Sequence, residues 1–299
     1  MTPTVEAAVN RRLSGLTARL GGEERTFECC DTRFTVVVDG RGASRAARRA
    51  ERTARALEAQ LDAFDEASAV SELNREGRVS NPHVAAIVRR GFEYADRTDG
   101  VFAITNGETE HALKAYLRGE VDSRPESTPR RDRPGTVRVR GDAVETDVPL
   151  DLNGLAKGYV VDRAAEALAG FARRGFVNGG GDVSRPTGPV GIESPYGESR
   201  PLKVVATDWN VATSGGYRRR RADLDHIYDA RAGRVGASHE LVTVVATRDC
   251  MEADALATTL AALSLEEALS LAERWDGVEA LVVHDGVLHE TEGFGDHVA

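Results

Sequence analysis

The spacing of hydrophobic and polar positions predicts a chain in which strands and helices are mixed. Short apolar or alternating runs predict strands at residues 33–38, 136–139, 143–146, 203–206, 209–212, 241–246, 280–284 and 287–289. Segments with apolar positions three or four residues apart predict helices at residues 43–64, 82–98, 159–168, 251–263 and 265–275. Because the strands do not alternate one to one with the helices, the pattern favours an α+β fold with antiparallel or mixed sheets over a β-α-β array.

The chain divides into an N-terminal extension and one large domain. Apolar residues at positions 5, 9, 13, 16 and 20 recur at helical spacing, so residues 1–28 are predicted to be an amphipathic extension. Residues 29–299 are long enough to form a single domain with its own core. Within this domain, residues 118–135 hold three prolines and many charges, which predicts a surface loop.

The stretch from Asp151 to Gly158 joins a predicted strand end at residues 148–151 to the helix predicted at residues 159–168. The first turn of a helix has unpaired N–H groups and a partial positive charge, so phosphate is favoured at such a junction. Lys157 adds a mobile cation, Asp151 could hold a ribose or base donor, and Gly154 could offer its carbonyl to a metal. Taken alone, the stretch is also compatible with a turn whose glycines serve the backbone only.

Composition and charge narrow the classes of function. Hydrophobic residues make up 41% of the chain and charged residues 29%, as in soluble globular proteins. The net charge of −9 opposes the basic field that general binding to nucleic acid or to anionic membranes requires. The three cysteines lack C-x-x-C spacing, which predicts reduced thiols and an intracellular protein. Without a signal-peptide core or a long apolar run, we expect a cytoplasmic protein with no transmembrane segment.

Three further motifs follow the Asp151–Gly158 stretch. Residues 176–183 form a glycine-rich strand turn that lets a ligand approach, but they lack the helix-opening G-x-G-x-x-G of a dinucleotide fold. Residues 212–217 precede a histidine-containing segment at residues 226–233. Asp254 and Thr258 lie four residues apart on one face of a predicted helix. A carboxylate and a hydroxyl at this spacing can both reach a hard cation such as Mg²⁺.

Together these motifs resemble the ApbE family, the flavin transferases that attach FMN to a protein threonine with FAD as donor. The family pattern D-L-x-G-I-A-K-G-Y-x-x-D is similar to residues 151–162, and N-x-G-G-D is similar to residues 178–182. T-S-G-x-Y-x-R corresponds to residues 213–219, H-I-x-D-P-x-T-G to residues 226–233, and E-A-D-A-L-S/A-T-A to residues 252–259. The resemblance covers roughly residues 30–290 and is strongest from about residue 148 to residue 263.

The resemblance implies a T-fold-like architecture and a Mg²⁺-dependent FAD:protein FMN transferase. One or two Mg²⁺ ions would be held by Asp254, Thr258 and the Gly154 carbonyl, next to the FAD pyrophosphate. His226 is the candidate base that takes the proton of the acceptor threonine, and AMP leaves. The residues implied to bind FAD are Asp151, Lys157, Tyr228, Phe64, Phe102, Ala103, Cys30, Thr213, Ser214 and Gly215.

The part of the chain up to about residue 147 departs from the family pattern. Asp31 lies where the family motif M-G-T has glycine, and Ala103 lies where G-x-F-D-x-T has a carboxylate. Phe64 replaces a tyrosine, and Ala257 lies where some members have a further acidic metal ligand. The changes at residues 31, 64 and 103 keep the implied metal site and alter the nucleotide end, so they affect the expected FAD affinity. Ala257 implies that the metal has fewer protein ligands and more water.

Two other functions fit the same residues. An FAD pyrophosphatase would use water in place of threonine and give FMN and AMP, while a flavin-nucleotide-binding module would bind FAD without turnover. Single residues also have simpler interpretations, because Asp254 could cap its helix and His226 could be a structural loop histidine.

Overall fold

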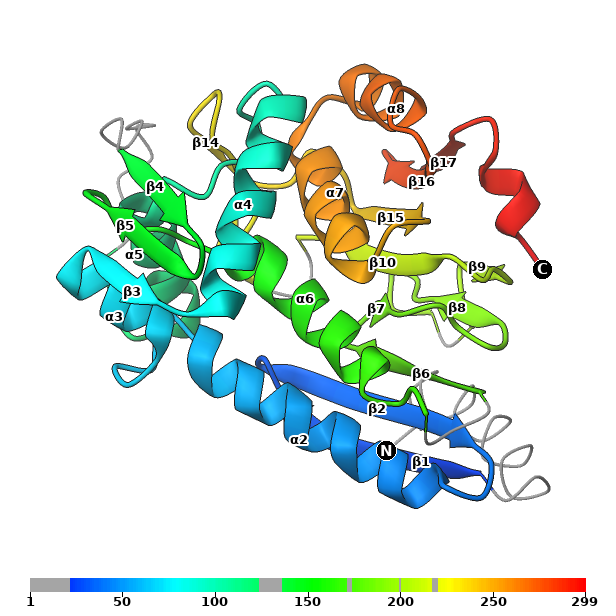
Figure 1. The fold of residues 1–299 in the computed structure, drawn as a ribbon. Coiled ribbons are helices and arrows are strands. Elements are labelled where there is room, and N and C mark those ends of the chain that lie inside the picture. Colours follow the sequence, from blue (N-terminus) through cyan, green and yellow to red (C-terminus); the bar gives the residue numbers. More distant parts are fainter. Residues whose placement is uncertain (1–21, 124–135, 171–173, 199, 217–219) are drawn as a thin grey trace.

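The computed structural model describes residues 22–123, 136–170, 174–198, 200–216 and 220–299. At its centre is an eight-stranded sheet in which every neighbouring pair is antiparallel. Its strands, in spatial order, are β1 (Glu23–Cys29), β2 (Thr32–Asp39), β6 (Arg174–Gly179), β7 (Asp182–Val183), β10 (Asn210–Ser214), β15 (Leu241–Ala246), β16 (Val278–His284) and β17 (Val287–Glu290) (Figure 1). Strands from both halves of the chain therefore share one sheet.

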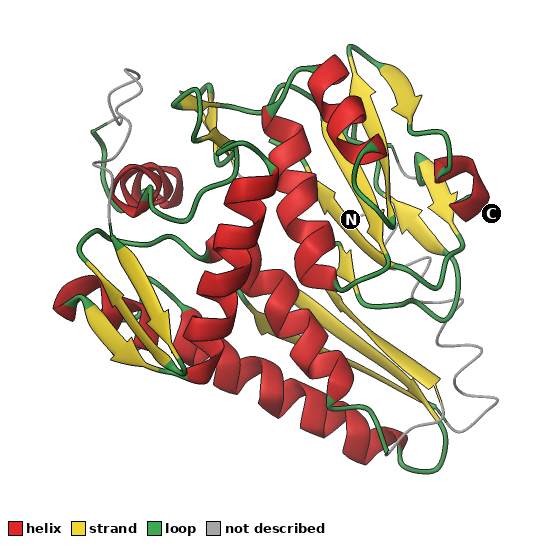
Figure 2. Ribbon diagram, turned by 45° about the horizontal axis from the view of Figure 1, so that its top comes forward, coloured by secondary structure: helices red, strands yellow, loops and turns green. Residues whose placement is uncertain are grey.

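Helices cover one face of this sheet. The helices in contact with it are α2 (Ala43–Leu61), α6 (Asn153–Glu166), α7 (Cys250–Ala262) and α8 (Leu265–Glu273), and α4 (Pro82–Arg97) packs against α6 (Figures 1 and 2). Helix α7 is buried along nearly its whole length, in keeping with its run of Ala and Leu. A layer of helices on an antiparallel sheet confirms the α+β class predicted from the sequence.

The opposite face of the sheet is covered by strands β8 (Val190–Ile192) and β9 (Lys203–Val205) and by the C-terminal 3₁₀ helix η1 (Phe294–His297). Both faces of β2 are therefore buried. Val36 and Val38 belong to the core under the helices, whereas Val37 belongs to the second core. This two-sided burial explains why residues 36–38 are apolar at three consecutive positions instead of alternating with polar residues.

A smaller sheet lies at one end of the helix layer and has the order β3 (Arg78–Ser80), β5 (Ala143–Thr146), β4 (Val137–Arg140). Helix α3 (Ala69–Glu76) contacts this sheet. Helix α5 (Gly107–Arg118) contacts the first of two short ribbons, which are β11 (Arg220–Arg221) with β12 (Leu224–Asp225) and β13 (Tyr228–Asp229) with β14 (Arg234–Val235). None of the described helices has the length and apolar character needed to cross a bilayer.

The start of α6 corrects one prediction from the sequence. Residues 148–151 are not a strand end, and α6 begins at Asn153, six residues before the predicted start. Residues 149–151 form a loop in which Asn74 Oδ1 accepts from Leu150 N at 2.8 Å and Asn74 Nδ2 donates to Leu150 O at 2.9 Å. Gly154 and Lys157 therefore lie within the first turns of the helix, not in a turn before it.

Other predicted elements compare with the structure as follows. The helix at residues 82–98 and the strand at 241–246 are confirmed, as is the hairpin at 136–146. Strand β1 and helices α3 and α5 were not predicted. The domain boundary that we placed after residue 28 cuts β1, which pairs with β2 along its whole length. The predicted helix in residues 1–20 and most of the predicted loop at 118–135 lie outside the described residues.

A pair of histidines, of which His239 is buried, gives this fold an expected dependence on pH. His239 Nδ1 lies 3.1 Å from His284 Nδ1, and His239 is buried. Burial and the neighbouring His284 lower the pKa of His239 to about 4, whereas an unfolded histidine titrates near about 6.5. The unfolded state therefore binds the proton first, and the free energy of unfolding should fall by about 1–3 kcal/mol as the pH drops from about 6.5 to about 4.

Urea unfolding at several pH values across this range measures the effect. The His239→Gln variant removes the titrating ring and should show a smaller loss of stability over the same range. An equal loss in the variant and the parent would show that other groups cause it.

Candidate active site

The structure places two adjoining cavities between the β1–β2 turn, α5, α6 and the segment around His226. One cavity of about 470 Å³, the cysteine lobe, has Cys30, Glu58, Phe64 and Arg118 in its wall. The other, of about 390 Å³, is the threonine lobe, and its wall includes Gly154, Thr213, Ser214, Gly215, Asp254 and Thr258. Both walls contain Asp31, Lys114, Asn153, Lys157 and His226, so the two lobes form one cleft.

The threonine lobe depends on the close approach of α6 and α7. A Cβ atom on Gly158 would lie 2.6 Å from Met251 Cα and 2.8 Å from the Cys250 carbonyl, so only glycine fits at this contact. Asp162 of α6 also accepts hydrogen bonds from the N–H groups of Cys250 and Met251, at 2.8 and 3.0 Å. Gly158 and Asp162 thus fix the N-terminal end of α7 against α6.

Asp254 extends this contact into the lobe. Its Oδ2 accepts from Gly158 N at 3.1 Å, and its Oδ1 lies 3.3 Å from Lys157 Nζ. One turn later, Thr258 Oγ1 lies 3.3 Å from Ser214 Oγ of β10. The N-cap of α7 is Asp249, which accepts from Glu252 N at 2.8 Å, so the interpretation of Asp254 as a helix cap is wrong.

The Lys157 ammonium group lies between two buried carboxylates. It forms ion pairs with Asp254 and with Asp182, which follows the glycine turn between β6 and β7. Asp182 is fully buried, and its Oδ1 has no hydrogen-bond partner among the described residues. This part of the cleft therefore concentrates negative charge around a single lysine.

Asp151 lies beneath the cleft and is not part of either wall. Its Oδ2 accepts from Lys114 Nζ at 2.5 Å, and its Oδ1 accepts from Asn153 N at 2.9 Å. Burial would raise its pKa, but the charge of Lys114 and the hydrogen bond from His111 hold the pKa of Asp151 well below its usual range. Lys114 itself lines both lobes, so Asp151 acts on the cleft by positioning this lysine and the start of α6.

His226 lies in a loop that a buried carboxylate holds in place. Asp225 Oδ1 accepts from Ile227 N at 2.9 Å, and its Oδ2 accepts from Ala237 N at 3.0 Å. Gly216 packs tightly on Asp225, because an added Cβ would lie 2.4 Å from Asp225 Oδ2. His226 is therefore presented to both lobes from a fixed backbone.

The cysteine lobe combines a ring, a guanidinium group and a carboxylate. The Arg118 guanidinium carbon lies 3.9 Å from the centre of the Phe64 ring, and Arg118 also forms an ion pair with Asp31. Asp31 is in the left-handed conformation with φ 56°. At the position where the family pattern has glycine, this chain therefore has Asp31, whose carboxylate pairs with Arg118 in the wall of the lobe.

Besides Asp151, three residues that the resemblance implied to bind FAD lie away from the two walls. Tyr228 is buried in β13, and Ala103 lies half-buried in the loop before α5. Phe102 supports α6 from below, since a Cβ on Gly154 would lie 3.0 Å from its ring. Their direct contact with a nucleotide stays a prediction.

Several residues in and beside the cleft were not predicted from the sequence. Lys114, Asn153, Glu58 and Arg118 line the cleft and were not among the candidates, and neither was Asp182. Lys114 is one of only three lysines in the chain, which is the signal that could have identified it. Its helix, however, was not predicted, so nothing in the pattern placed it near residue 151.

Most of this chain is similar to proteins of one known family. The sequence model of the ApbE family matches residues 30–282. The FAD:protein FMN transferase of Vibrio cholerae serotype O1 is 28% identical over 201 residues, which cover 56% of this chain and 60% of the relative. The enzyme of the same name from Chlamydia trachomatis serovar D is 34% identical over 137 residues, which cover 42% and 43%. The chain thus matches about half the length of these curated relatives.

Solved structures extend the likeness over nearly the whole chain. The ApbE protein of Thermotoga maritima superposes with a TM-score of 0.81 at 22% identity, covering 93% of this chain and 99% of that one. The apo flavinyl transferase ApbE of Pseudomonas stutzeri superposes with a TM-score of 0.76 at 26% identity, covering 93% and 98%. The fold implied by the sequence motifs is thereby confirmed. From its motifs, its fold and the matched residues, this chain belongs to the ApbE family.

Proposed function

We propose that this protein is a Mg²⁺-dependent FAD:protein FMN transferase, which moves FMN from FAD to a threonine hydroxyl of an acceptor protein and releases AMP. The observation that carries the proposal is the threonine lobe, where oxygen donors from α6, β10 and α7 face one cavity beside Lys157 and His226. The names of the curated relatives support the same activity. The cytoplasmic location stays a prediction from the sequence.

The donors of the threonine lobe fit a hard divalent cation. Asp254 offers a carboxylate and Thr258 a hydroxyl, which are ligands that Mg²⁺ prefers. Gly158 N–H, which would pair with the Gly154 carbonyl in an ideal α-helix, donates to Asp254 instead. The Gly154 carbonyl would therefore serve as the third donor. The buried Asp182 Oδ1 beside them adds acceptor capacity. One or two ions bound here would supply positive charge to the pyrophosphate of FAD.

The residues around this site suit the proposed transfer. Lys157 would contact a phosphate of FAD, and Phe64 with Arg118 would provide a stacking surface for a planar ring. His226 would take the proton of the threonine hydroxyl as its oxygen attacks the FMN-side phosphorus. The bond from that phosphorus to the bridging oxygen then breaks, and AMP leaves with the electron pair.

One assay tests the proposal against the two other functions. The protein is incubated with FAD, Mg²⁺ and a threonine-bearing acceptor protein, and the AMP released and the flavin fluorescence on a denaturing gel are measured. Transfer gives both signals. AMP without labelled acceptor indicates an FAD pyrophosphatase, while FAD binding without either signal indicates a binding module.

The His226→Gln variant is expected to bind FAD with nearly unchanged affinity and to transfer FMN about 10²- to 10⁴-fold more slowly. The change removes the base and keeps a polar side chain of similar reach in the loop held by Asp225. FAD affinity by flavin fluorescence and transfer rate on the gel are measured separately. Full transfer activity in the variant would remove His226 from the mechanism.

The Asp31→Gly variant is expected to bind FAD about three- to tenfold more tightly. It removes a negative charge from both lobes, frees Arg118 to meet a phosphate, and suits the left-handed φ of this position. Fluorescence titration with FAD at two salt concentrations measures the gain, which should shrink as salt rises.

Asp285→Gly is the matched control for this variant. Asp285 has φ 50° in the tight β16–β17 turn, and it lies outside both lobes. Its replacement changes the net charge and the backbone in the same way without touching the cleft. Equal effects of the two variants would show that net charge, and not the position of Asp31, sets the affinity.

A further inference from the structure

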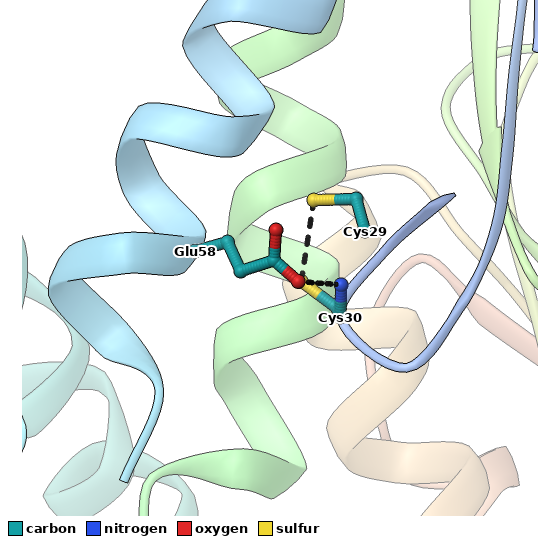
Figure 3. A group of neighbouring side chains, drawn as sticks. All are labelled: Cys29, Cys30 and Glu58. Atoms are coloured by element: carbon teal, nitrogen blue, oxygen red, sulfur yellow. Dashed lines mark hydrogen bonds between the residues drawn. The ribbon is translucent and has the colours of Figure 1, made fainter. Parts of the chain in front are cut away.

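Two adjacent cysteines and a glutamate meet at the β1–β2 turn, beside the cleft but separate from the threonine lobe. Cys29 is the last residue of β1, Cys30 begins the turn, and Glu58 reaches toward them from α2 (Figure 3). The two sulfurs and a carboxylate oxygen all lie within 4.8 Å of one another. The sequence gives no hint of this group, because Glu58 is 28 positions away from Cys30.

The β1–β2 turn explains why the sulfur atoms of two neighbouring cysteines lie close together. Successive side chains of a strand point to opposite faces, which would separate the two sulfurs. Here Cys30 and Asp31 both have positive φ, 53° and 56°, as in a two-residue hairpin turn. The chain reverses at Cys30, and its sulfur lies 3.8 Å from that of Cys29.

This sulfur separation matches a tetrahedral metal site. Two thiolates bound at about 2.3 Å to a tetrahedral Zn²⁺ ion have their sulfurs about 3.8 Å apart. The sulfurs of Cys29 and Cys30 are therefore already at the distance that two ligands of such an ion require. Zn²⁺ also accepts carboxylate oxygen as a ligand, and the Glu58 carboxylate already bonds to Cys30 N.

The charge around the three groups favours a cation. No lysine, arginine or histidine of the described residues forms an ion pair with Glu58. Two basic residues of the same lobe, Lys114 and Arg118, pair with Asp151 and Asp31 instead. Two thiolates and this carboxylate would carry three negative charges, which a divalent ion largely offsets.

We infer that Cys29, Cys30 and Glu58 form a binding site for a thiophilic divalent cation such as Zn²⁺. The site is distinct from the hard-oxygen donors of Asp254 and Thr258, because sulfur ligands select a softer ion. Three protein ligands leave one tetrahedral position open. Cys30 and Glu58 line the cysteine lobe, so that position faces the cleft.

The test uses the whole reduced protein and two metals. Zn²⁺ affinity is measured by competition with a chromophoric chelator, in the presence of a large excess of Mg²⁺. Co²⁺ is then added in place of Zn²⁺, because thiolate bound to Co²⁺ gives a charge-transfer band whose intensity follows the number of sulfur ligands. We expect one Zn²⁺ per chain, no competition by Mg²⁺, and a Co²⁺ band typical of two thiolates.

Substitution of each proposed ligand shows whether that residue binds the Zn²⁺ ion. Cys30→Ser and Cys29→Ser should each halve the Co²⁺ band and weaken Zn²⁺ binding by about 100-fold, and Glu58→Gln should weaken it by about tenfold with the band retained. Cys250→Ala is the matched control, since Cys250 is a buried thiol at the start of α7 and should leave both readouts unchanged.

The proposal fails if Cys30→Ser binds Zn²⁺ like the parent, or if Mg²⁺ displaces Zn²⁺, which would place the ion at Asp254. Because Cys30 is half-exposed, its replacement keeps the test valid even if the buried Cys29→Ser variant does not fold. Neither result depends on FMN transfer, so the Zn²⁺ site can be disproved without disproving the proposed function, and the reverse is also true.

Discussion

Replacing Asp254 by asparagine is expected to lower turnover of FAD by about 10³-fold or more while the protein stays folded. Asp254 is the single carboxylate among the three proposed metal donors, and asparagine keeps its size and its ability to accept from Gly158 N. The loss should therefore come from the charge that holds the cation. The measurement is the rate of AMP release at saturating FAD over a range of Mg²⁺ concentrations, where the variant should need far more Mg²⁺.

A second aspartate on the same helix provides the control. Asp249 caps α7 and pairs with Arg90 at 2.9 Å, and it lies outside both lobes. Asp249→Asn should cost about 1 kcal/mol or less of stability and leave turnover within about twofold. If Asp254→Asn behaved like this control, the threonine lobe would not be the metal site, and the proposed function would lose the observation that carries it.

Elements with a strong local pattern could be predicted from the sequence. Strand β15 has an apolar run, interrupted only by Thr243 and bounded by polar residues, and α4 begins with Asn81 as a cap and Pro82 at its first position. Strand β1 was missed because it is an edge strand with charged residues between its apolar ones, a pattern that is weak over seven residues. Helix α3 was missed because eight residues are too few to establish a helical period.

In the site, too, residues related by local spacing could be predicted, whereas residues brought together from distant parts of the chain could not. Asp254 and Thr258 could be placed together because one helix turn relates them. The position of Asp151 could not be predicted, because its partner Lys114 is 37 residues away in a helix that the pattern did not reveal. Likewise, the glycines at 154 and 158 lower helix propensity and so displaced the predicted start of α6. The reason for both glycines is contact with other segments, Phe102 and Met251.

The Gly158→Ala variant is expected to lose about 3 kcal/mol of stability and about 10²-fold in turnover. Helix propensity alone predicts the opposite, a gain of about 1 kcal/mol for alanine inside a helix. The added methyl group, however, would lie 2.6 Å from Met251 Cα and 2.8 Å from the Cys250 carbonyl. Both are backbone atoms, so no rotamer change relieves the clash, and α6 and α7 must move apart.

Such a movement affects function because the proposed metal donors are divided between these two helices. The Gly154 carbonyl lies on α6, as does Lys157, which would contact a phosphate, whereas Asp254 and Thr258 lie on α7. Thermal unfolding and the Mg²⁺ dependence of AMP release measure the two losses, and Gly295→Ala is the control, since a Cβ there meets no atom within 4 Å. A Gly158→Ala protein that matched its parent in both stability and turnover would show that the helix contact has room for a methyl group. If turnover fell while stability held, the spacing of the donors alone would be the cause.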